Sequence, residues 1–145
     1  MSQLTPSQLI PHAGNMCLLE QIVSWDEQGI VCSTQSHKSL ANPLRSNDQL
    51  SVIHAVEYGA QAVAVHGGLL AHEKGEAIKP GYLAALRQIK FHCSRLDEIE
   101  SVLTVAVTQL LSDAGNLMYS FTVTANTQAI AEGRVVIVVQ PEVST

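Results

Sequence analysis

Residues 53–70, IHAVEYGAQAVAVHGGLL, decide the fold of this chain. The stretch contains no proline, and apolar residues recur through it at helical spacing. This spacing predicts one long helix from about residue 48 to residue 65 or beyond. Ser46 and Gln49 would form a capping box at its start, and Gly67 with Gly68 would stop it. The helix is apolar almost all round, so we expect both of its sides to be buried.

A carboxylate lies in the middle of this apolar helix. His54 precedes Glu57 by three residues and Gln61 follows it by four, so the three side chains share one face. With His66, these residues would place four polar side chains inside the hydrocarbon if the helix spanned a membrane. We therefore expect a core helix of a water-soluble domain, and the glutamate needs a functional or structural reason.

Strand-like runs lie on both sides of the helix. Residues 17–25 and 30–37 precede it, joined by the turn DEQG, and four runs follow it at residues 81–93, 101–111, 117–126 and 129–139. The turns are short, which favours antiparallel pairing. We expect an α+β fold, with a curled antiparallel sheet of five to seven strands around the helix. A short helix at Thr5 to Ile10, stopped by Pro11, and a surface loop at residues 71–81 complete the prediction.

Composition narrows the function classes. The 145 residues suggest a single domain, and with 46% hydrophobic and 14% charged residues part of the surface is expected to be covered by another subunit. The net charge is −5 and the basic residues are scattered, which argues against nucleic-acid binding. Three distant cysteines show no metal-ligand spacing and are expected to be buried free thiols, which favours a reducing compartment such as the cytoplasm.

Four segments, in this order and spacing, resemble a known family. They are IPHAGNMCLLEQIV (10–23), VEYGAQA (56–62), GYLAALRQIKFHCSRLDEIESVLTVAV (81–107) and AIAEGRVVIVV (129–139). The chain resembles the 3-hydroxyacyl-acyl-carrier-protein dehydratases of the hotdog superfamily, and within it a divergent branch associated with aryl-polyene lipid pathways. The resemblance covers almost the whole chain.

The resemblance implies both a fold and a reaction. The sheet would wrap round the helix, two copies would pair as a homodimer or a dimer of dimers, and acyl tunnels would lie at their interface. The reaction would remove water from a 3-hydroxyacyl thioester and leave a trans-2-enoyl thioester. The acyl group would arrive on the phosphopantetheine arm of an acyl carrier protein, and neither a metal nor an organic cofactor would be needed.

The resemblance also implies roles for residues. Glu57 would be the general acid, because a carboxyl group in an apolar channel keeps its proton more readily when desolvation disfavours the charged form. Gln61 would belong to the substrate-binding side of the site and could hold that carboxyl group by a hydrogen bond. His12, in the N-terminal motif, would have a structural role.

The base of the reaction is the difficulty. The family's usual histidine lies 14 residues before the acid, where this chain has Pro43, and the loop ANPLRSNDQL contains no histidine. The glycine that usually opens the helix is also missing. His54, on the face of Glu57, and His37, at the end of the second strand, are the two substitutes.

Two other readings remain open beside the dehydratase. The same fold with Glu57 activating water would give an acyl thioesterase. Loss of the base would give a non-catalytic acyl-binding or partner subunit.

Overall fold

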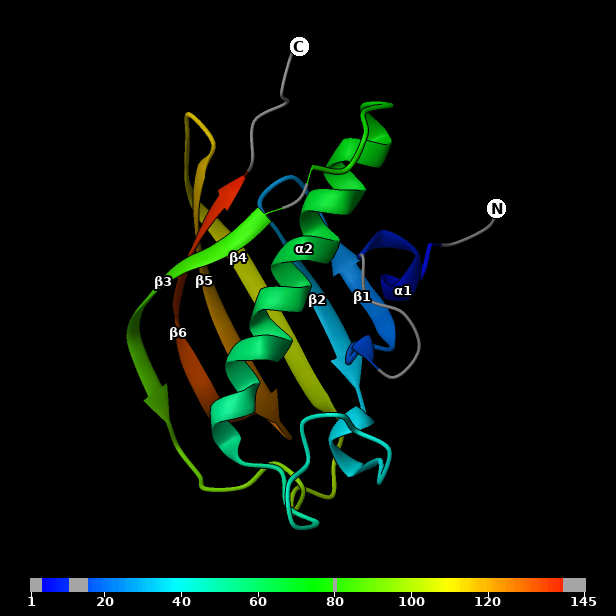
Figure 1. Ribbon diagram of the computed structural model, residues 1–145, viewed down its shortest axis with the longest axis vertical. Coiled ribbons are helices and arrows are strands. Elements are labelled where there is room, and N and C mark those ends of the chain that lie inside the picture. Colours follow the sequence, from blue (N-terminus) through cyan, green and yellow to red (C-terminus); the bar gives the residue numbers. More distant parts are fainter. Residues whose placement is uncertain (1–3, 11–15, 80, 140–145) are drawn as a thin grey trace.

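A computed structural model describes residues 4–10, 16–79 and 81–139 of the chain. The helices are α1 (Pro6–Leu9), the 3₁₀ turns η2 (Ser36–Lys38) and η3 (Val52–His54), and the long α2 (Ala55–Glu73). The strands are β1 (Gln21–Trp25), β2 (Gly29–Thr34), β3 (Gly81–Phe91), β4 (Leu103–Asp113), β5 (Asn116–Ala125) and β6 (Gln128–Val139). The sheet curls around α2, which crosses its concave face (Figure 1).

The sheet has six strands in the order β1-β2-β4-β5-β6-β3, and every neighbouring pair is antiparallel. Side chains alternate along β5, where Phe121, Val123 and Ala125 are buried while Thr122 is exposed. Because successive side chains of a strand point to opposite faces of the sheet, the apolar side chains lie against the helix. The expected α+β class, strand number and antiparallel pairing are confirmed.

The start of the long helix was predicted too early. Asn47 and Asp48 have φ values of 53° and 59°, in the left-handed region that no α-helix continues through. Ser46 and Gln49 consequently face each other in an isolated β-bridge rather than in a capping box. The chain turns helical only at Val52, so the 3₁₀ turn η3 leads into α2.

The end of the helix was predicted too soon. Gly67 and Gly68 lie inside α2, which continues to Glu73 and takes up the first residues of the expected surface loop. Gly68 serves close packing, because a Cβ there would stand 2.9 Å from the carbonyl oxygen of Leu9. Gly68 thus admits α1 to the helix surface, and the double glycine does not end the helix.

The expectation that α2 is buried on all sides holds for only part of its surface. The side facing the sheet is buried, and Gly59 lets the ring of Phe121 pack directly on the helix backbone. Along the other side, Val56, Ala60 and Ala64 are only half-buried. This half-buried stripe is the surface that one sheet cannot cover.

Strand β3 forms one edge of the sheet and exposes apolar side chains. It pairs only with β6 among the described strands, and Tyr82 is 58% exposed while Leu83 and Leu86 are each 46% exposed. A sheet edge beside apolar surface is a place where a further strand can add. It is the second surface of the fold that suits a partner.

Three smaller expectations can also be compared with the structure. Thr5 begins α1, where its backbone N–H donates to the Gln8 side chain at 2.8 Å, while the stop expected at Pro11 lies outside the described residues. Cys17, Cys32 and Cys93 are free thiols, as predicted, but only Cys32 is buried and the other two are partly exposed. No helix in the described ranges is long and apolar enough to cross a membrane.

Candidate active site

Glu57 and Gln61 meet on the first two turns of α2. The Gln61 side-chain amide Nε2 donates to Glu57 Oε1 at 3.2 Å, the contact that their four-residue spacing allows. Gln61 is only 3% exposed, whereas Glu57 is half-buried and lies next to the half-buried stripe of α2. A carboxyl group therefore lies at the boundary between the core and the open side of the helix.

Two further hydrogen bonds fix the orientation of the Gln61 amide. Its Oε1 accepts the backbone N–H of Leu18 at 2.8 Å, and Nε2 also donates to the carbonyl of Met16 at 2.9 Å. Since a backbone N–H can only donate, Oε1 must face Leu18 and Nε2 must face Glu57. Glu57 Oε1 is engaged as an acceptor, so Oε2 is the oxygen left to carry or receive a proton.

His54 lies at the start of α2, three residues before Glu57, and is half-buried. It lines a hollow of about 540 Å³. The other lining residues are mostly hydroxyl and amide side chains with one guanidinium group: Leu44, Ser46, Asn47, Gln49, Ser51, Ser94 and Arg95. Arg95 is itself paired with Asp97 and Glu98 at 2.5 and 3.1 Å, so its charge is largely balanced. The hollow is polar and carries an imidazole at its wall.

The first N–H groups of the helix are already paired. The Val52 N–H donates to the carbonyl of Ser94 at 3.0 Å, and the Ile53 N–H donates to Ser51 Oγ at 3.3 Å. These N–H groups at the start of the helix are therefore engaged in internal hydrogen bonds. The departure seen in the sequence is thus matched by a different local structure.

His37 lies apart from this group. It is fully buried in η2, and its Nε2 lies 3.0 Å from the carbonyl of Ile99, which can only accept, so Nε2 carries the proton. Its Nδ1 has no hydrogen-bond partner among the described residues. Burial lowers the pKa of His37, which favours the neutral ring. Among the described residues, no hydrogen bond links His37 to Glu57 or Gln61.

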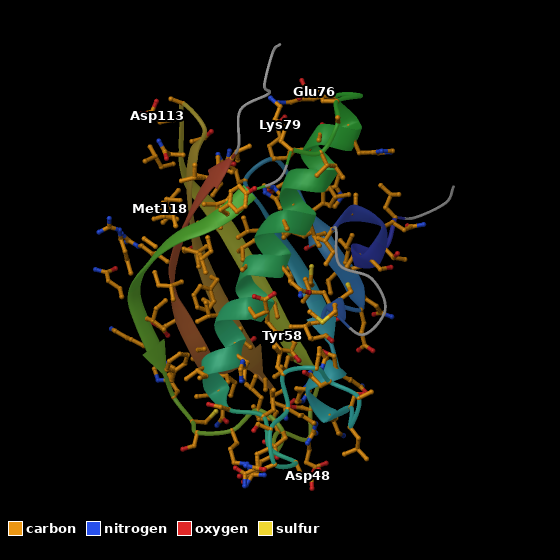
Figure 2. All side chains as sticks on the ribbon, in the orientation of Figure 1. Asp48, Tyr58, Glu76, Lys79, Asp113 and Met118 are labelled. Atoms are coloured by element: carbon orange, nitrogen blue, oxygen red, sulfur yellow. The ribbon has the colours of Figure 1, made fainter. Side chains whose placement is uncertain are left out.

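A cluster of buried polar groups adjoins Glu57 that the sequence reading missed. The Tyr58 hydroxyl lies 2.8 Å from Ser36 Oγ and accepts from Asn42 Nδ2 at 3.1 Å. Tyr58 lies on α2 toward the loop that follows β2 (Figure 2). The only signal in the sequence was a tyrosine directly after the glutamate, which reads equally well as a packing residue.

His66 belongs to a different part of the helix. Its Nδ1 lies 2.6 Å from the Tyr119 hydroxyl and its Nε2 lies 2.8 Å from the carbonyl of Asp26. It follows Glu57 by nine residues, which is about 13 Å along a helix. His66 therefore ties α2 to β5 and to the β1–β2 turn, while His12 lies outside the described residues.

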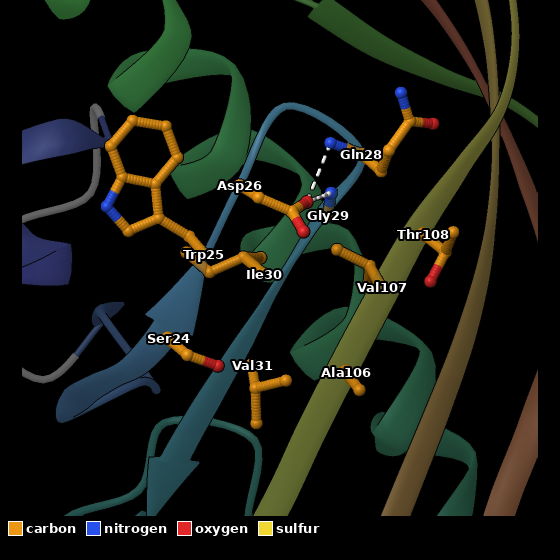
Figure 3. Close-up of a pocket in the computed structure, with 10 residues that line it drawn as sticks. All are labelled: Ser24, Trp25, Asp26, Gln28, Gly29, Ile30, Val31, Ala106, Val107 and Thr108. Carbon is orange, nitrogen blue, oxygen red and sulfur yellow. Dashed lines mark hydrogen bonds between the residues drawn. The ribbon is translucent and has the colours of Figure 1, made fainter.

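A second hollow, of about 270 Å³, lies at the β1–β2 turn (Figure 3). There Asp26 Oδ1 accepts the backbone N–H groups of Gln28 and Gly29 at 2.8 and 3.0 Å. Gly29 is required, because a Cβ would stand 2.2 Å from the carbonyl oxygen of Val107. This hollow lies beside the β1–β2 turn, near the His66 end of α2 and away from Glu57.

Known proteins resemble this chain in sequence and in fold. A family model described as "ApeP-like: ApeP dehydratase" matches residues 4–145, and a search of curated proteins found no match. A chain of the dehydratase heterocomplex ApeI:P from Xenorhabdus doucetiae is similar over 97% of this chain and 94% of its own, with 24% identity and a TM-score of 0.87.

More distant structures share the architecture. A hypothetical thioesterase with coenzyme A from Streptococcus pneumoniae TIGR4 is 13% identical over 86% of this chain and 88% of its own, with a TM-score of 0.61. The PaaI protein of E. coli is 16% identical over 81% of both chains, with a TM-score of 0.59. At these identities the likeness shows the fold, and the expected hotdog fold is confirmed.

Proposed function

The chain belongs to the ApeP-like dehydratase family, and on that premise we propose that it removes water from a 3-hydroxyacyl thioester to give the trans-2-enoyl thioester. The acyl group is carried on the phosphopantetheine arm of an acyl carrier protein, in fatty-acid or aryl-polyene-type lipid biosynthesis. The observation that carries the proposal is the Glu57 carboxyl group, held by a buried glutamine beside an apolar stripe.

Glu57 acts as the general acid. Elimination breaks the C2–H and C3–O bonds and forms the C2=C3 double bond, so the leaving hydroxide needs a proton. Glu57 Oε1 accepts from Gln61, and Oε2 therefore carries the proton that leaves with the hydroxyl group as water. Gln61 holds the carboxyl group in one orientation and thereby defines the substrate-binding side of the site.

His54 is the base that takes the C2 proton. It lies one helical turn before Glu57 and lines the polar hollow, where a substrate arm can reach it. His37 is the weaker alternative, because its ring is fully buried and its Nε2–H is committed to Ile99. Proton return from His54 to Glu57 through the released water would restore both groups after each turnover.

The substrate chain follows from the two surfaces next to these groups. The half-buried stripe of Val56, Ala60 and Ala64 is apolar and small, as a channel for an acyl chain requires. The polar hollow beside His54 suits the amide-bearing arm of a carrier protein. The proposed steps use only these side chains and draw on neither a metal nor an organic cofactor.

A second subunit completes the channel. The exposed apolar residues of β3, Tyr82, Leu83 and Leu86, lie on a sheet edge that a like strand can extend. We propose a homodimer or a dimer of dimers built on this edge. A different hotdog chain is the alternative, because the related ApeI:P structure is a heterocomplex.

Two other functions remain as alternatives. A thioesterase is one alternative, since a hypothetical thioesterase with coenzyme A from S. pneumoniae shares the fold, and it would use Glu57 to activate water. A non-catalytic acyl-binding or partner subunit is favoured by the loop around Pro43, where the usual histidine is missing.

The three functions give different products. The purified protein is incubated with 3-hydroxyacyl and with plain acyl thioesters on carrier protein, and enoyl product and free thiol are measured. Enoyl product without free thiol supports the dehydratase. Free thiol from both substrates supports the thioesterase, and binding with no turnover supports the partner subunit. His54→Ala and His37→Ala, assayed side by side, then identify the base.

A further inference from the structure

We propose that Tyr58 is a positioning residue for the reaction, acting on Glu57 through a chain of hydrogen bonds that begins at the loop after β2. The inference rests on the proposed function of Glu57. Tyr58 touches neither Glu57 nor the substrate directly in this chain of contacts. Tyr58 is linked to Glu57 by successive hydrogen bonds through Ser36, Leu18 and Gln61.

The chain begins at Asn42, which is 6% exposed and immediately precedes Pro43. Its Nδ2 donates to the Tyr58 hydroxyl at 3.1 Å and to the carbonyl of Ser36 at 2.9 Å, and its Oδ1 accepts from Leu44 N–H at 2.9 Å. Three of the four hydrogen bonds that this amide can make thus tie the loop around Pro43 together and fix it to Tyr58 on the helix.

The direction of the next links follows from which groups can donate. Ser36 Oγ donates its single proton to the carbonyl of Leu18 at 2.6 Å. The 2.8 Å contact between Ser36 Oγ and Tyr58 must therefore use the tyrosine proton. Burial raises the pKa of Tyr58, so the hydroxyl keeps this proton. Thr34 Oγ1 also donates to the Leu18 carbonyl, at 2.6 Å, and strengthens the same anchor.

The far end of the chain reaches the carboxyl group. The Leu18 N–H donates to Gln61 Oε1 at 2.8 Å, and Gln61 Nε2 donates to Glu57 Oε1 at 3.2 Å. Every donor from Asn42 to Gln61 points the same way, toward Glu57. The Leu18 backbone is held on both sides, so a shift at its carbonyl is passed to its N–H and to the Gln61 amide.

A buried tyrosine needs a reason for its hydroxyl group. Tyr58 is fully buried, and phenylalanine would fill nearly the same space without the cost of desolvating a polar group. Glu57 is half-buried and has Gln61 as its hydrogen-bond partner, so its orientation depends on Gln61 staying in place. A misplacement of about 1 Å in a catalytic group can lower turnover by about 100-fold, so even a part of that shift is measurable.

Tyr58→Phe tests the inference, and Tyr119→Phe is its matched control. Tyr119 is also a buried tyrosine, 1% exposed, but its hydroxyl pairs with His66 Nδ1 at 2.6 Å, outside the chain of hydrogen bonds. Each variant loses one buried hydroxyl group, so both should lose stability. Dehydration of a 3-hydroxyacyl thioester is measured for kcat and KM. Hydrogen exchange of the Gln61 side-chain amide protons is followed by NMR in the same proteins.

We expect Tyr58→Phe to lower kcat by about tenfold with KM nearly unchanged, and to speed exchange of the Gln61 amide protons. Tyr119→Phe should change neither. The inference would be overturned by equal kcat in the two variants, or by a Gln61 amide exchange rate that is unchanged in Tyr58→Phe. If the wild-type protein has no dehydratase activity, the proposed function fails. The Gln61 exchange then still decides whether Tyr58 holds this amide.

Discussion

Gln61 offers the sharpest test of how the site is held together, because one side chain satisfies three other groups. We consider Gln61→Met, which keeps the length and approximate volume of the side chain and removes both amide functions. The variant leaves the Leu18 N–H without its acceptor, and Leu18 is 1% exposed, so water cannot easily replace the amide.

The expected loss of stability can be worked from these contacts. A buried donor left unsatisfied costs about 1–3 kcal/mol. Met16 is 46% exposed and Glu57 is half-buried, so their oxygens can turn to water at little cost. We therefore expect Gln61→Met to lower the free energy of unfolding by about 2 kcal/mol, roughly a 30-fold change in the folding equilibrium.

Urea unfolding at neutral pH measures this loss. With an m-value of about 2 kcal/mol/M, the midpoint should fall by about 1 M. Gln61→Glu is the matched comparison, because it keeps an oxygen acceptor for the Leu18 N–H and loses the donor to Glu57. Both variants should lose most of their turnover. A midpoint for Gln61→Met within about 0.2 M of the wild type would refute the claim that this amide anchors residues 16–18.

Three further predictions follow from the helix and the sheet edge. Gly59→Ala should destabilise the protein by about 1–2 kcal/mol, since its Cβ would meet the Phe121 ring at 2.9 Å. Gly67→Ala, whose Cβ would meet nothing within 4 Å, should stabilise the protein by about 0.5–1 kcal/mol. Urea unfolding of the two variants measures both changes. Burial lowers the pKa of His66 below 6.5, so below that pH the unfolded chain takes up a proton that the folded chain refuses. The unfolding free energy should then fall toward pH 5 by up to about 1.4 kcal/mol per pH unit, with a shallower slope in His66→Gln. Leu86→Lys, on the β3 edge, should weaken association in sedimentation experiments without lowering the helix and strand content seen by circular dichroism, and an unchanged assembly would exclude β3 as the interface.

The strands could be predicted because each carries its own pattern. The short turn DEQG between two strand-like runs predicted the antiparallel pair of β1 and β2. The helix boundaries failed for reasons that local pattern does not contain. Asn47 and Asp48 adopt left-handed conformations, and Gly68 is needed by a segment that lies far from it in the sequence.

Sequence spacing likewise predicts some contacts of the candidate site and not others. The contact between Glu57 and Gln61 could be predicted from spacing alone, because α2 carries both residues four positions apart. The partners of Gln61 lie 43 and 45 residues away, and those of Tyr58 lie 16 and 22 residues away. No periodicity encodes such pairs, since they exist only after the N-terminal segment and the loop after β2 have folded onto α2.

The most direct test of the proposal is turnover in Glu57→Gln. Glutamine keeps the size of the side chain and an oxygen that can accept from Gln61, but it has no acidic proton to give to the leaving hydroxide. With a 3-hydroxyacyl thioester on carrier protein, the rate of enoyl formation should fall by at least about 100-fold while the thermal unfolding midpoint stays near that of the wild type. Enoyl formation at the wild-type rate would show that the proton comes from another group.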